Sequence, residues 1–301
     1  MKYFLRIFFT LYILFAFVQK SKTPAMPNSL ADSPFSNGQK AGLMDNLEIN
    51  EVSGLVMSRN NPNGIWTHND SGDEPRVFLI SNKGKHWATF RITGANNRDW
   101  EDIAIANDKG INYLYVGDIG DNAAVSDIKI IYRFPEPTIN STATPTVGNI
   151  NVENVQKISF RYPDGNRDAE CLMVDPITKD IIVVSKREDN VGIYFAPYPQ
   201  SFTEVITLTK VGTLPFGDVV AGDISPDGKE LLLKNYKKVF YWKKADNETI
   251  VELMQKSFQN LPYKRETQGE PIAWNIDGSS YFTLSENPDN KPNYLLYYQR
   301  K

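Results

Sequence analysis

The segments NRDWED (97–102) and NRDAEC (166–171) repeat one pattern, Asn-Arg-Asp-x-Glu, and each leads directly into an apolar run. A pattern that recurs at this distance indicates either coincidence or an internal structural repeat. Five apolar runs begin with, or directly follow, an acidic residue: Glu51, Glu101, Glu170, Asp223 and Glu270. These acids lie 50, 69, 53 and 47 residues apart, and a polar insertion at 138–154 accounts for the long interval. We therefore interpret the pattern as an internal repeat.

Each repeat is typical of a group of short β-strands, because turn signals rich in Gly, Asn, Asp and Pro separate its apolar runs. The first four repeats each have a fourth, outer strand, which we expect at 86–92, 155–161, 205–211 and 249–255. The fifth repeat ends after three strands, so we expect 45–50 to supply its outer strand. Four-stranded units repeated in this way predict an all-β, five-bladed β-propeller whose last blade is closed by an N-terminal strand. A six-bladed propeller and a β-sandwich are the alternatives.

The N-terminal region predicts export. In residues 1–23, Lys2 and Arg6 accompany an apolar run, as in a signal peptide or an uncleaved N-terminal anchor. Residues 24–44 are rich in Pro, Ser and Asn and are typical of a flexible leader, which leaves 45–301 for the propeller domain. We expect a secreted monomer in the periplasm, at the cell surface or outside the cell, with membrane contact only through an uncleaved segment.

Composition argues against several kinds of bond, partner and metal site. The single cysteine, Cys171, excludes an intramolecular disulfide. A net charge of −3 gives no overall attraction to nucleic acid. The chain has only two histidines and no H-E-x-x-H motif, which argues against a zinc site.

The five leading acids should meet, because the first strand of every propeller blade lines the central channel. We expect loops 68–75, 117–127, 186–190, 235–238 and 285–292 to surround the same channel mouth. Two carboxylates ~6 Å apart repel by about 3 kcal/mol at an effective dielectric constant of 20. Such a ring therefore needs protonation, neighbouring arginines or a metal ion. Oxygen ligands without His or Cys favour Ca²⁺.

The candidate residues follow from this arrangement. The metal-ligand candidates are Glu101, Glu170 and Glu270, followed by Glu51 and Asp223. The ligand-binding candidates are Asn69, Asp70, Asp118, Asp121, Asn122 and Trp100. The candidate general base is His68, with a structural histidine bonded to a loop carbonyl as the alternative.

Two alternatives concern other residues of the repeat. Trp100 either stacks on a ligand or packs between blades. Arginine neutralisation of the acids remains open, because an arginine precedes three of them: Arg98, Arg167 and Arg265. Each of these arginines also has an acid of its own nearby: Asp99, Asp168 and Glu266. Such pairs would leave the inner acids without a counter-ion.

Three motifs, HNDSGD (68–73), DWEDIA (99–104) and GDIGDN (117–122), resemble those of an uncharacterised exported bacterial β-propeller family. The acid-headed strands are distantly similar to lactonases of the gluconolactonase and paraoxonase type and to five-bladed calcium-activated nucleotidases. That resemblance implies a Ca²⁺ ion that polarises a substrate oxygen, but it transfers no catalytic residue to this chain.

Together these observations predict an exported β-propeller with a Ca²⁺ site at the channel mouth. A small oxygen-rich ligand, a glycan or a protein would bind at the same face. Such a protein either hydrolyses an ester, lactone or phosphoester, or is a non-catalytic protein- or glycan-binding propeller with a structural ion or no ion. The sequence leaves open whether it is an enzyme.

Overall fold

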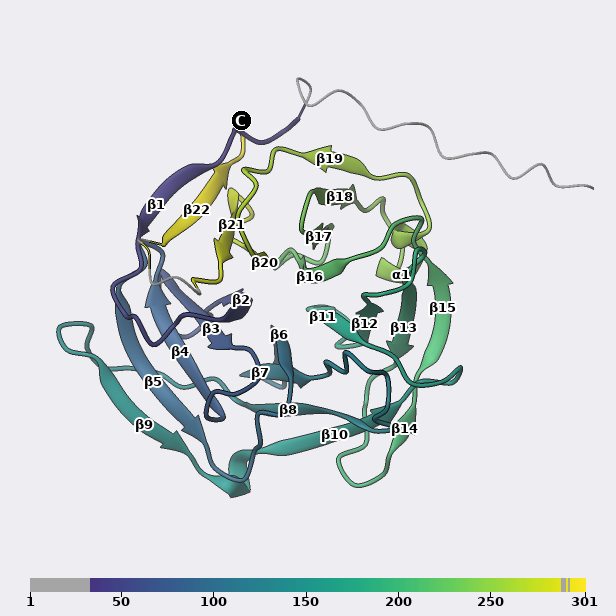
Figure 1. Ribbon diagram of the computed structural model, residues 1–301, viewed down its shortest axis with the longest axis horizontal. Helices are drawn as coiled ribbons and strands as arrows, with labels where there is room; N and C mark the ends of the chain where they lie inside the picture. The colour runs from purple at the N-terminus through teal and green to yellow at the C-terminus, as the bar shows by residue number, and fades with distance from the viewer. Residues whose placement is uncertain (1–32, 288–290, 292) are drawn as a thin grey trace, which may run out of the picture.

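The computed structural model describes residues 33–287, 291 and 293–301, which form five β-sheets around a central axis (Figure 1). Blade 1 contains β2 (Val52–Met57), β3 (Gly64–Asn69), β4 (Arg76–Ser81), β5 (His86–Ile92) and β9 (Thr146–Ile150). Blade 2 contains β6 (Trp100–Asp108), β7 (Ile111–Asp118), β8 (Lys129–Pro135), β10 (Gln156–Arg161) and β14 (Ile206–Thr207). Blade 3 contains β11 (Ala169–Val174), β12 (Ile181–Ser185), β13 (Gly192–Ala196) and β15 (Thr209–Thr213). The last two blades contain β16 (Val219–Ile224), β17 (Glu230–Asn235), β18 (Val239–Lys243) and β19 (Gln259–Leu261) in blade 4, and β20 (Gly269–Trp274), β21 (Ser280–Ser285), β22 (Tyr294–Gln299) and β1 (Gln39–Leu43) in blade 5.

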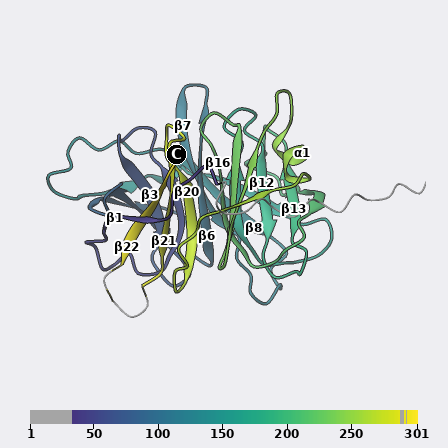
Figure 2. The same ribbon diagram turned by 90° about the horizontal axis from the view of Figure 1, so that it is seen from above.

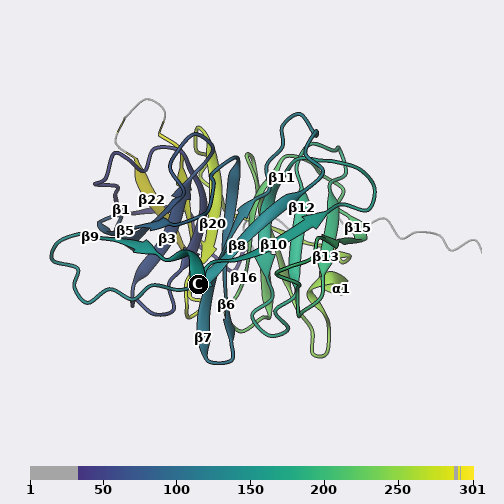
Figure 3. The ribbon, with the colours of Figure 1, turned by 90° about the horizontal axis from the view of Figure 1, so that it is seen from below.

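The inner strands β2, β6, β11, β16 and β20 lie nearest the axis (Figure 1). Strands cross the thickness of the disc, and the connecting loops lie at its two faces (Figures 2 and 3). Five apolar clusters form the core, each made by residues of two neighbouring blades. The inner strands are apolar runs rather than alternating ones because blades cover them on both sides. The five-bladed propeller is confirmed, and six blades are excluded for the described residues.

The ring is closed by an N-terminal strand, as predicted, but by a different segment. β1 (Gln39–Leu43) pairs antiparallel with β22, whereas 45–50 is not a strand. Upstream of β1, Phe35 is fully buried and packs against aromatic rings of blades 4 and 5. Burying a Phe side chain stabilises a fold by about 1.5–3 kcal/mol. The predicted leader therefore contains part of the propeller, while residues 1–32, including the predicted signal segment, lie outside the described residues.

The outer strand of blade 4 was also assigned to the wrong segment. Residues 249–255 contain the helix α1 (Ile250–Met254), and β19 is the outer strand. Thr249 and Glu252 form a capping box, in which each side chain accepts a hydrogen bond from the other residue's backbone N–H. This local capping outweighs the strand preference of the β-branched Ile and Val. No helix in the described part of the chain is long and apolar enough to span a membrane.

Two peripheral segments tie neighbouring blades together. The predicted strands at 86–92 and 155–161 are confirmed, as β5 and β10. The segment 205–211, predicted as one strand, is divided between β14, which pairs parallel with β10 in blade 2, and β15 in blade 3. The polar insertion at 138–154 contributes β9, which pairs parallel with β5. Blades 1 and 2 therefore each gain a fifth strand from a segment that follows them in the chain.

Candidate functional site

Every inner strand carries a β-bulge near its N-terminal end, where pairing with the second strand of its blade shifts by one residue. Bulges re-aim side chains and are frequent beside functional sites. The bulges fall at equivalent positions in the five blades. We call the bulged residues the inner ring: Ser53, Glu101, Glu170, Val220 and Glu270.

A second set of equivalent positions follows directly after the second strand of each blade. We call these residues the outer ring: Asp70, Ile119, Lys186, Tyr236 and Glu286. Their strands end opposite the bulges. Lys186 contacts Glu170 of its own blade, whereas Asp70 lies beside Glu101, and Tyr236 beside Glu270, of the following blade. The two rings together form the channel mouth.

Three inner-ring carboxylates converge. Glu101, Glu170 and Glu270 are all buried, and each places one carboxylate oxygen within 4.8 Å of the others. We call these residues the glutamate trio. Ser53 Oγ lies 3.3 Å from Glu101 Oε2 and 3.4 Å from Glu270 Oε2. Burial and, after it, the neighbouring carboxylates raise the pKa of Glu101 and Glu170 well above the ordinary value.

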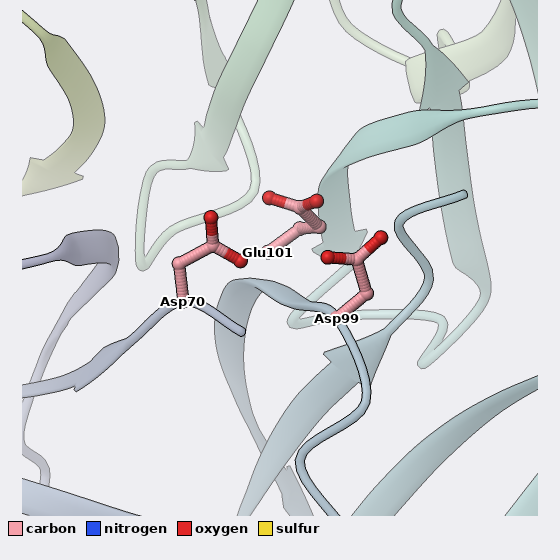
Figure 4. A group of neighbouring side chains, drawn as sticks. All are labelled: Asp70, Asp99 and Glu101. Carbon is pink, nitrogen blue, oxygen red and sulfur yellow. The ribbon is translucent and has the colours of Figure 1, made fainter. Parts of the chain in front are cut away.

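A second acidic group shares Glu101. Asp70, Asp99 and Glu101 also place one oxygen each within 4.8 Å of one another, and Figure 4 shows their carboxylates gathered at one point. Burial first, and then Asp99 and other nearby acids, raise the pKa of Asp70 to about 6. Gly120 passes so close that a Cβ atom there would overlap both Glu101 Oε1 and Asp99 Oδ2. Glycine at this position therefore leaves room for two carboxylates against the backbone.

One cation contacts the trio from the opposite side of the mouth. Lys186 Nζ pairs with Glu170 Oε1 and donates to Tyr236 Oη, 3.0 Å away. Tyr236 Oη in turn donates to Glu270 Oε1 at 2.6 Å. Burial alone would lower the pKa of Lys186, but the neighbouring carboxylate of Glu170 raises it above the ordinary value. Partial neutralisation thus comes from a lysine rather than from the arginines that the sequence left open as an alternative.

The arginines of the repeat bind other groups. Arg98 lies 3.4 Å from Asp118 Oδ1, and Arg167 pairs with Asp164 at 2.7 Å and with Glu188 at 2.5 Å. Arg265 is exposed. The first two arginines brace the loops that enter their blades, and in the described part of the chain the glutamate trio has no guanidinium contact.

Two predicted metal ligands do not join the trio. Glu51 is exposed and lies two residues before Ser53, which occupies the inner-ring position of blade 1. Asp223 lies three residues beyond Val220, where its Oδ2 accepts the backbone N–H of Trp274 at 2.7 Å. Burial raises the pKa of Asp223 to about 7. Matching the repeats by their leading acids therefore misplaced the register in blades 1 and 4.

The predicted ligand-binding loop residues are largely engaged within the protein. Asn69 is buried, and its side-chain amide donates to the backbone of the preceding loop at 2.7 Å. Asp118 accepts a backbone N–H at 3.0 Å, and Asp121 pairs with the buried Lys129 at 2.6 Å. Asn122 is exposed. Of the predicted ligand-binding residues, Asp70 is the one that belongs to a carboxylate cluster.

His68 and Trp100 lie in the interface between blades 1 and 2. Both are fully buried, and their rings meet edge to face with centroids 5.7 Å apart. His68 Nδ1 is 3.0 Å from the carbonyl oxygen of Asn69, and burial lowers the pKa of His68 to about 4. Trp100 Nε1 donates to the carbonyl oxygen of Asn96 at 2.8 Å. Burial and these internal contacts favour the structural alternatives for both residues over a general base at His68 and ligand stacking at Trp100.

The donor set of the trio fits Ca²⁺. The contributing atoms are all oxygens, which suits a hard cation that takes six to eight oxygen ligands. Glu170 Oε2 is buried and, within the described residues, accepts no hydrogen bond. Sequence reasoning missed Ser53 because equivalence among the blades follows the bulge register. It placed the loops of Lys186 and Tyr236 at the mouth but named neither residue as a candidate. Asp99 was overlooked as a mouth residue although it lies inside the repeated motif.

Comparisons with known proteins add no family. A scan against protein-family models finds no match for this chain. A search of curated proteins also finds no significant relative. The function therefore has to be inferred from the chemistry of the channel mouth.

Proposed function

We propose that the protein is a Ca²⁺-dependent hydrolase of an ester, lactone or phosphoester, with the ion held by the glutamate trio and Ser53. The observation that carries this proposal is the convergence of three buried carboxylates from three blades within 4.8 Å. Packing does not require them, because Val220 is fully buried and apolar at the equivalent position of blade 4. Buried carboxylates that the fold does not need are a frequent mark of a functional site.

Charge supports a divalent cation. The trio, Asp70 and Asp99 together bring five carboxyl groups to the mouth, and Lys186 provides the ammonium that contacts the trio. Taking ionised carboxylates out of water is costly unless they are paired with positive charge. One lysine leaves most of this charge uncompensated, so the site either retains protons or binds a cation.

The chain offers groups for hydrolysis beside the ion site. When bound, Ca²⁺ would act as a Lewis acid that polarises a carbonyl or phosphoryl oxygen. Asp70 is half-buried next to Glu101, and its pKa of about 6 suits proton transfer near neutral pH. We assign to Asp70 the role of general base, which takes a proton from the attacking water. The carboxylate of Asp99 lies beside that of Asp70.

A non-catalytic binding propeller is the second candidate, and the Lys186–Glu170 pair favours it. An ammonium already lies against the trio, so part of its charge is balanced without any ion. In this alternative the mouth binds a protein or glycan, and Asp70 has no chemical role. Export to the periplasm, the cell surface or the medium remains part of both proposals, supported by the signal-like residues 1–23.

Hydrolysis of chromogenic ester and phosphoester substrates and of simple lactones, with Ca²⁺ and with chelator, tests the first proposal. We expect Ca²⁺-dependent turnover that falls about 100-fold or more in Asp70→Asn, a typical loss for a general base. The matched control is Asp127→Asn, an exposed acid between β7 and β8. Turnover that persists in chelator or in Asp70→Asn would contradict the proposal. Ca²⁺ binding without turnover on any substrate class would favour the binding propeller.

A further inference from the structure

The polar insertion at 138–154 has no role in the site proposed at the channel mouth. It leads from the end of β8 to β9, which is the outermost strand of blade 1 (Figure 1). Residues 137–152 include no charged side chain and are rich in Thr, Asn and Ser. Hydroxyl and amide groups both donate and accept hydrogen bonds, so this segment offers neutral groups for recognition.

A hollow of about 230 Å³ lies between the start of this insertion and the turn that joins β2 to β3. Its apolar lining comes from Trp87 of β5, Pro62 and Ile139, and much of its polar lining comes from residues 140–142. The turn lies at the end of β2 away from the bulge. The hollow therefore borders the face of the disc opposite the channel mouth.

Hydrogen bonds hold the walls of the hollow in place. Asn61 is buried, its amide donates to the carbonyl oxygen of Pro137 at 2.9 Å, and its Oδ1 accepts the backbone N–H of Ile139 at 2.9 Å. The side-chain amide of Asn60 donates to the carbonyl oxygen of Glu136, also at 2.9 Å. The insertion is thus fixed to blade 1 where it borders the hollow. Walls that are already fixed lose little conformational freedom when a ligand binds.

Several groups that line the hollow are available to a ligand. Within the described residues, the Asn140 amide, the Thr142 hydroxyl and Trp87 Nε1 make no hydrogen bond to the protein. Asn140 and Thr142 are exposed. Trp87 is half-buried and packs against the apolar cluster between blades 1 and 2. Among the described residues, none that lines the hollow carries a charge.

A neutral sugar ring matches this lining. A pyranose presents C–H groups on its faces, which stack on an indole, and hydroxyl groups around its edge, which bond to amides and hydroxyls. The volume lies below the ~300–1,000 Å³ of sites that enclose a drug-sized molecule, so the hollow has room for a single ring. An anionic ligand such as a nucleotide would find no positive charge in this lining.

We propose that the hollow beside Trp87 binds one neutral pyranose ring of a glycan. The ring stacks on the indole, and its hydroxyl groups bond to Asn140 and Thr142. This inference is independent of the proposed Ca²⁺ site, because it places a saccharide on the opposite face of the disc.

Tryptophan fluorescence of the full-length protein tests the proposal. Trp87 is the accessible reporter, since the other four tryptophans, Trp66, Trp100, Trp242 and Trp274, are at most 2% exposed. The probes are the methyl glycosides, both anomers, of glucose, galactose, mannose and N-acetylglucosamine, with sorbitol as an acyclic polyol and adenosine as a flat aromatic ring. We expect at least one glycoside to change the emission saturably at millimolar concentration or below, with Ca²⁺ and with chelator, and sorbitol to have no effect. Failure of every glycoside, or tighter binding of adenosine than of any glycoside, overturns the proposal.

Substitutions locate the binding, with saturation-transfer NMR as the readout. Thr142→Val removes a hydroxyl at nearly constant volume and should weaken the best glycoside about threefold to tenfold. Its matched control is Thr144→Val, an exposed threonine of the same loop outside the lining of the hollow. Trp87→Ala should weaken the glycoside about tenfold or more, and Trp87→Phe, which keeps an aromatic face, should weaken it less. Phe202→Ala, which removes an exposed ring between β13 and β14, should have no effect.

The outcomes separate this site from the channel mouth. Equal affinities of Thr142→Val and Thr144→Val, or full binding by Trp87→Ala, overturn the proposal. Thr142 is exposed, so its variant keeps the test valid even if Trp87→Ala, which loses packing between blades, does not fold. Glycoside binding that disappears in chelator or in Asp70→Asn would place the sugar at the mouth and also overturn the proposal.

Discussion

The two sides of the channel mouth have equivalent backbone positions but opposite chemistry. On blades 1 and 2, Asp70, Asp99 and Glu101 bring three carboxylates together (Figure 4). On blades 3 and 4, the outer-ring positions hold Lys186 and Tyr236, and the inner ring includes an apolar Val220. The same bulged strand therefore accepts an acid or an apolar residue. The backbone therefore fixes the positions of these side chains, whereas their charge differs between blades and is available for binding.

A buried acid elsewhere shows what a structural carboxylate looks like. Glu136, in the loop after β8, accepts hydrogen bonds from Trp66 Nε1 at 2.8 Å, from Ser58 Oγ at 2.5 Å and from the backbone N–H groups of Arg59 and Asn60. Such a network satisfies its acceptor positions and joins blades 1 and 2. The glutamate trio has far fewer donors, and among the residues that the structure describes Glu170 Oε2 has none. This contrast is what an ion site would explain.

The largest expected effect comes from removing two charges of the trio. Glu101→Gln combined with Glu170→Gln should weaken Ca²⁺ binding by about 1,000-fold or more, since the ion loses two carboxylate ligands. The apo fold should survive, because repulsion among buried acids is relieved. Titration calorimetry and circular dichroism measure the two quantities. The matched control, Glu136→Gln, should lower stability and leave Ca²⁺ affinity intact; the reverse pattern would break the contrast drawn between the two kinds of acid.

Placing a lysine on the acidic side should make blade 1 resemble blade 3. Asp70→Lys puts an ammonium at the outer-ring position beside Glu101, so we expect a loss of Ca²⁺ binding of about 2 kcal/mol, roughly 30-fold. Calorimetric titration checks this value. Asp127→Lys changes an exposed acid by the same charge and should alter the affinity less than threefold. Equal effects of the two substitutions would mean that only overall charge matters.

Gly120→Ala tests the close approach of the two carboxylates to the backbone. The added Cβ would overlap Glu101 Oε1 and Asp99 Oδ2, so one carboxylate must move or the loop must shift. We expect a destabilisation of about 1–3 kcal/mol from overpacking, together with weaker Ca²⁺ binding. Urea unfolding and calorimetry measure the two effects. An unchanged Ca²⁺ affinity would indicate that Glu101 binds no ion in its present position.

The smallest expected effect is the pH dependence of the ion-free protein. Burial raises the pKa of Asp223 to about 7 and that of Glu286 to about 8, so the folded state keeps protons that the unfolded state loses. Stability must then fall as the pH rises from 6.5 to 8, by an amount on the order of 1 kcal/mol. His68, whose pKa is lowered to about 4, opposes this fall by only about 0.4 kcal/mol, because half of its unfolded form is still protonated at pH 6.5.

Urea unfolding in chelator at pH 6.5 and 8 measures this change. Ca²⁺ should reduce the fall, since its binding strengthens as carboxylates lose protons. Lys234, whose pKa burial lowers to about 8, affects stability mainly above this window. Stability that rises between pH 6.5 and 8 without Ca²⁺ would contradict the raised carboxyl pKa values.

The sequence predicted the propeller because strand and turn signals recur with each repeat, and it predicted the trio because Glu101 and Glu170 lie within the repeated motif. It could not predict the closing strand, since β1 lies in a polar segment and its anchor, Phe35, is an isolated ring. The bulges determine which residue of each inner strand faces the mouth. The sequence therefore suggested Glu51 instead of Ser53 as the ligand from blade 1, because no signal in the sequence marks a bulge.

Lys186 and Tyr236 lie in loops that the sequence placed at the mouth, but their contacts with the trio could not be predicted for a related reason. Each follows the second strand of its blade, and the equivalent residues of the other blades include an Asp, an Ile and a Glu. Only the paired register shows that these dissimilar residues share one position. Their surroundings also differ, because Ile119 packs in the apolar cluster between blades 2 and 3 whereas Lys186 and Tyr236 contact carboxylates.

Thermal unfolding of the full-length protein with Ca²⁺, with Mg²⁺ and with chelator tests the Ca²⁺ site most directly. At a concentration 100 times its Kd, Ca²⁺ should add about 2.7 kcal/mol, which raises the Tm by a few degrees for a domain of this size. Mg²⁺, which needs a compact octahedral site, should add less. The Glu101→Gln, Glu170→Gln variant should show no shift. Equal melting temperatures of the unsubstituted protein with Ca²⁺ and with chelator would contradict the site.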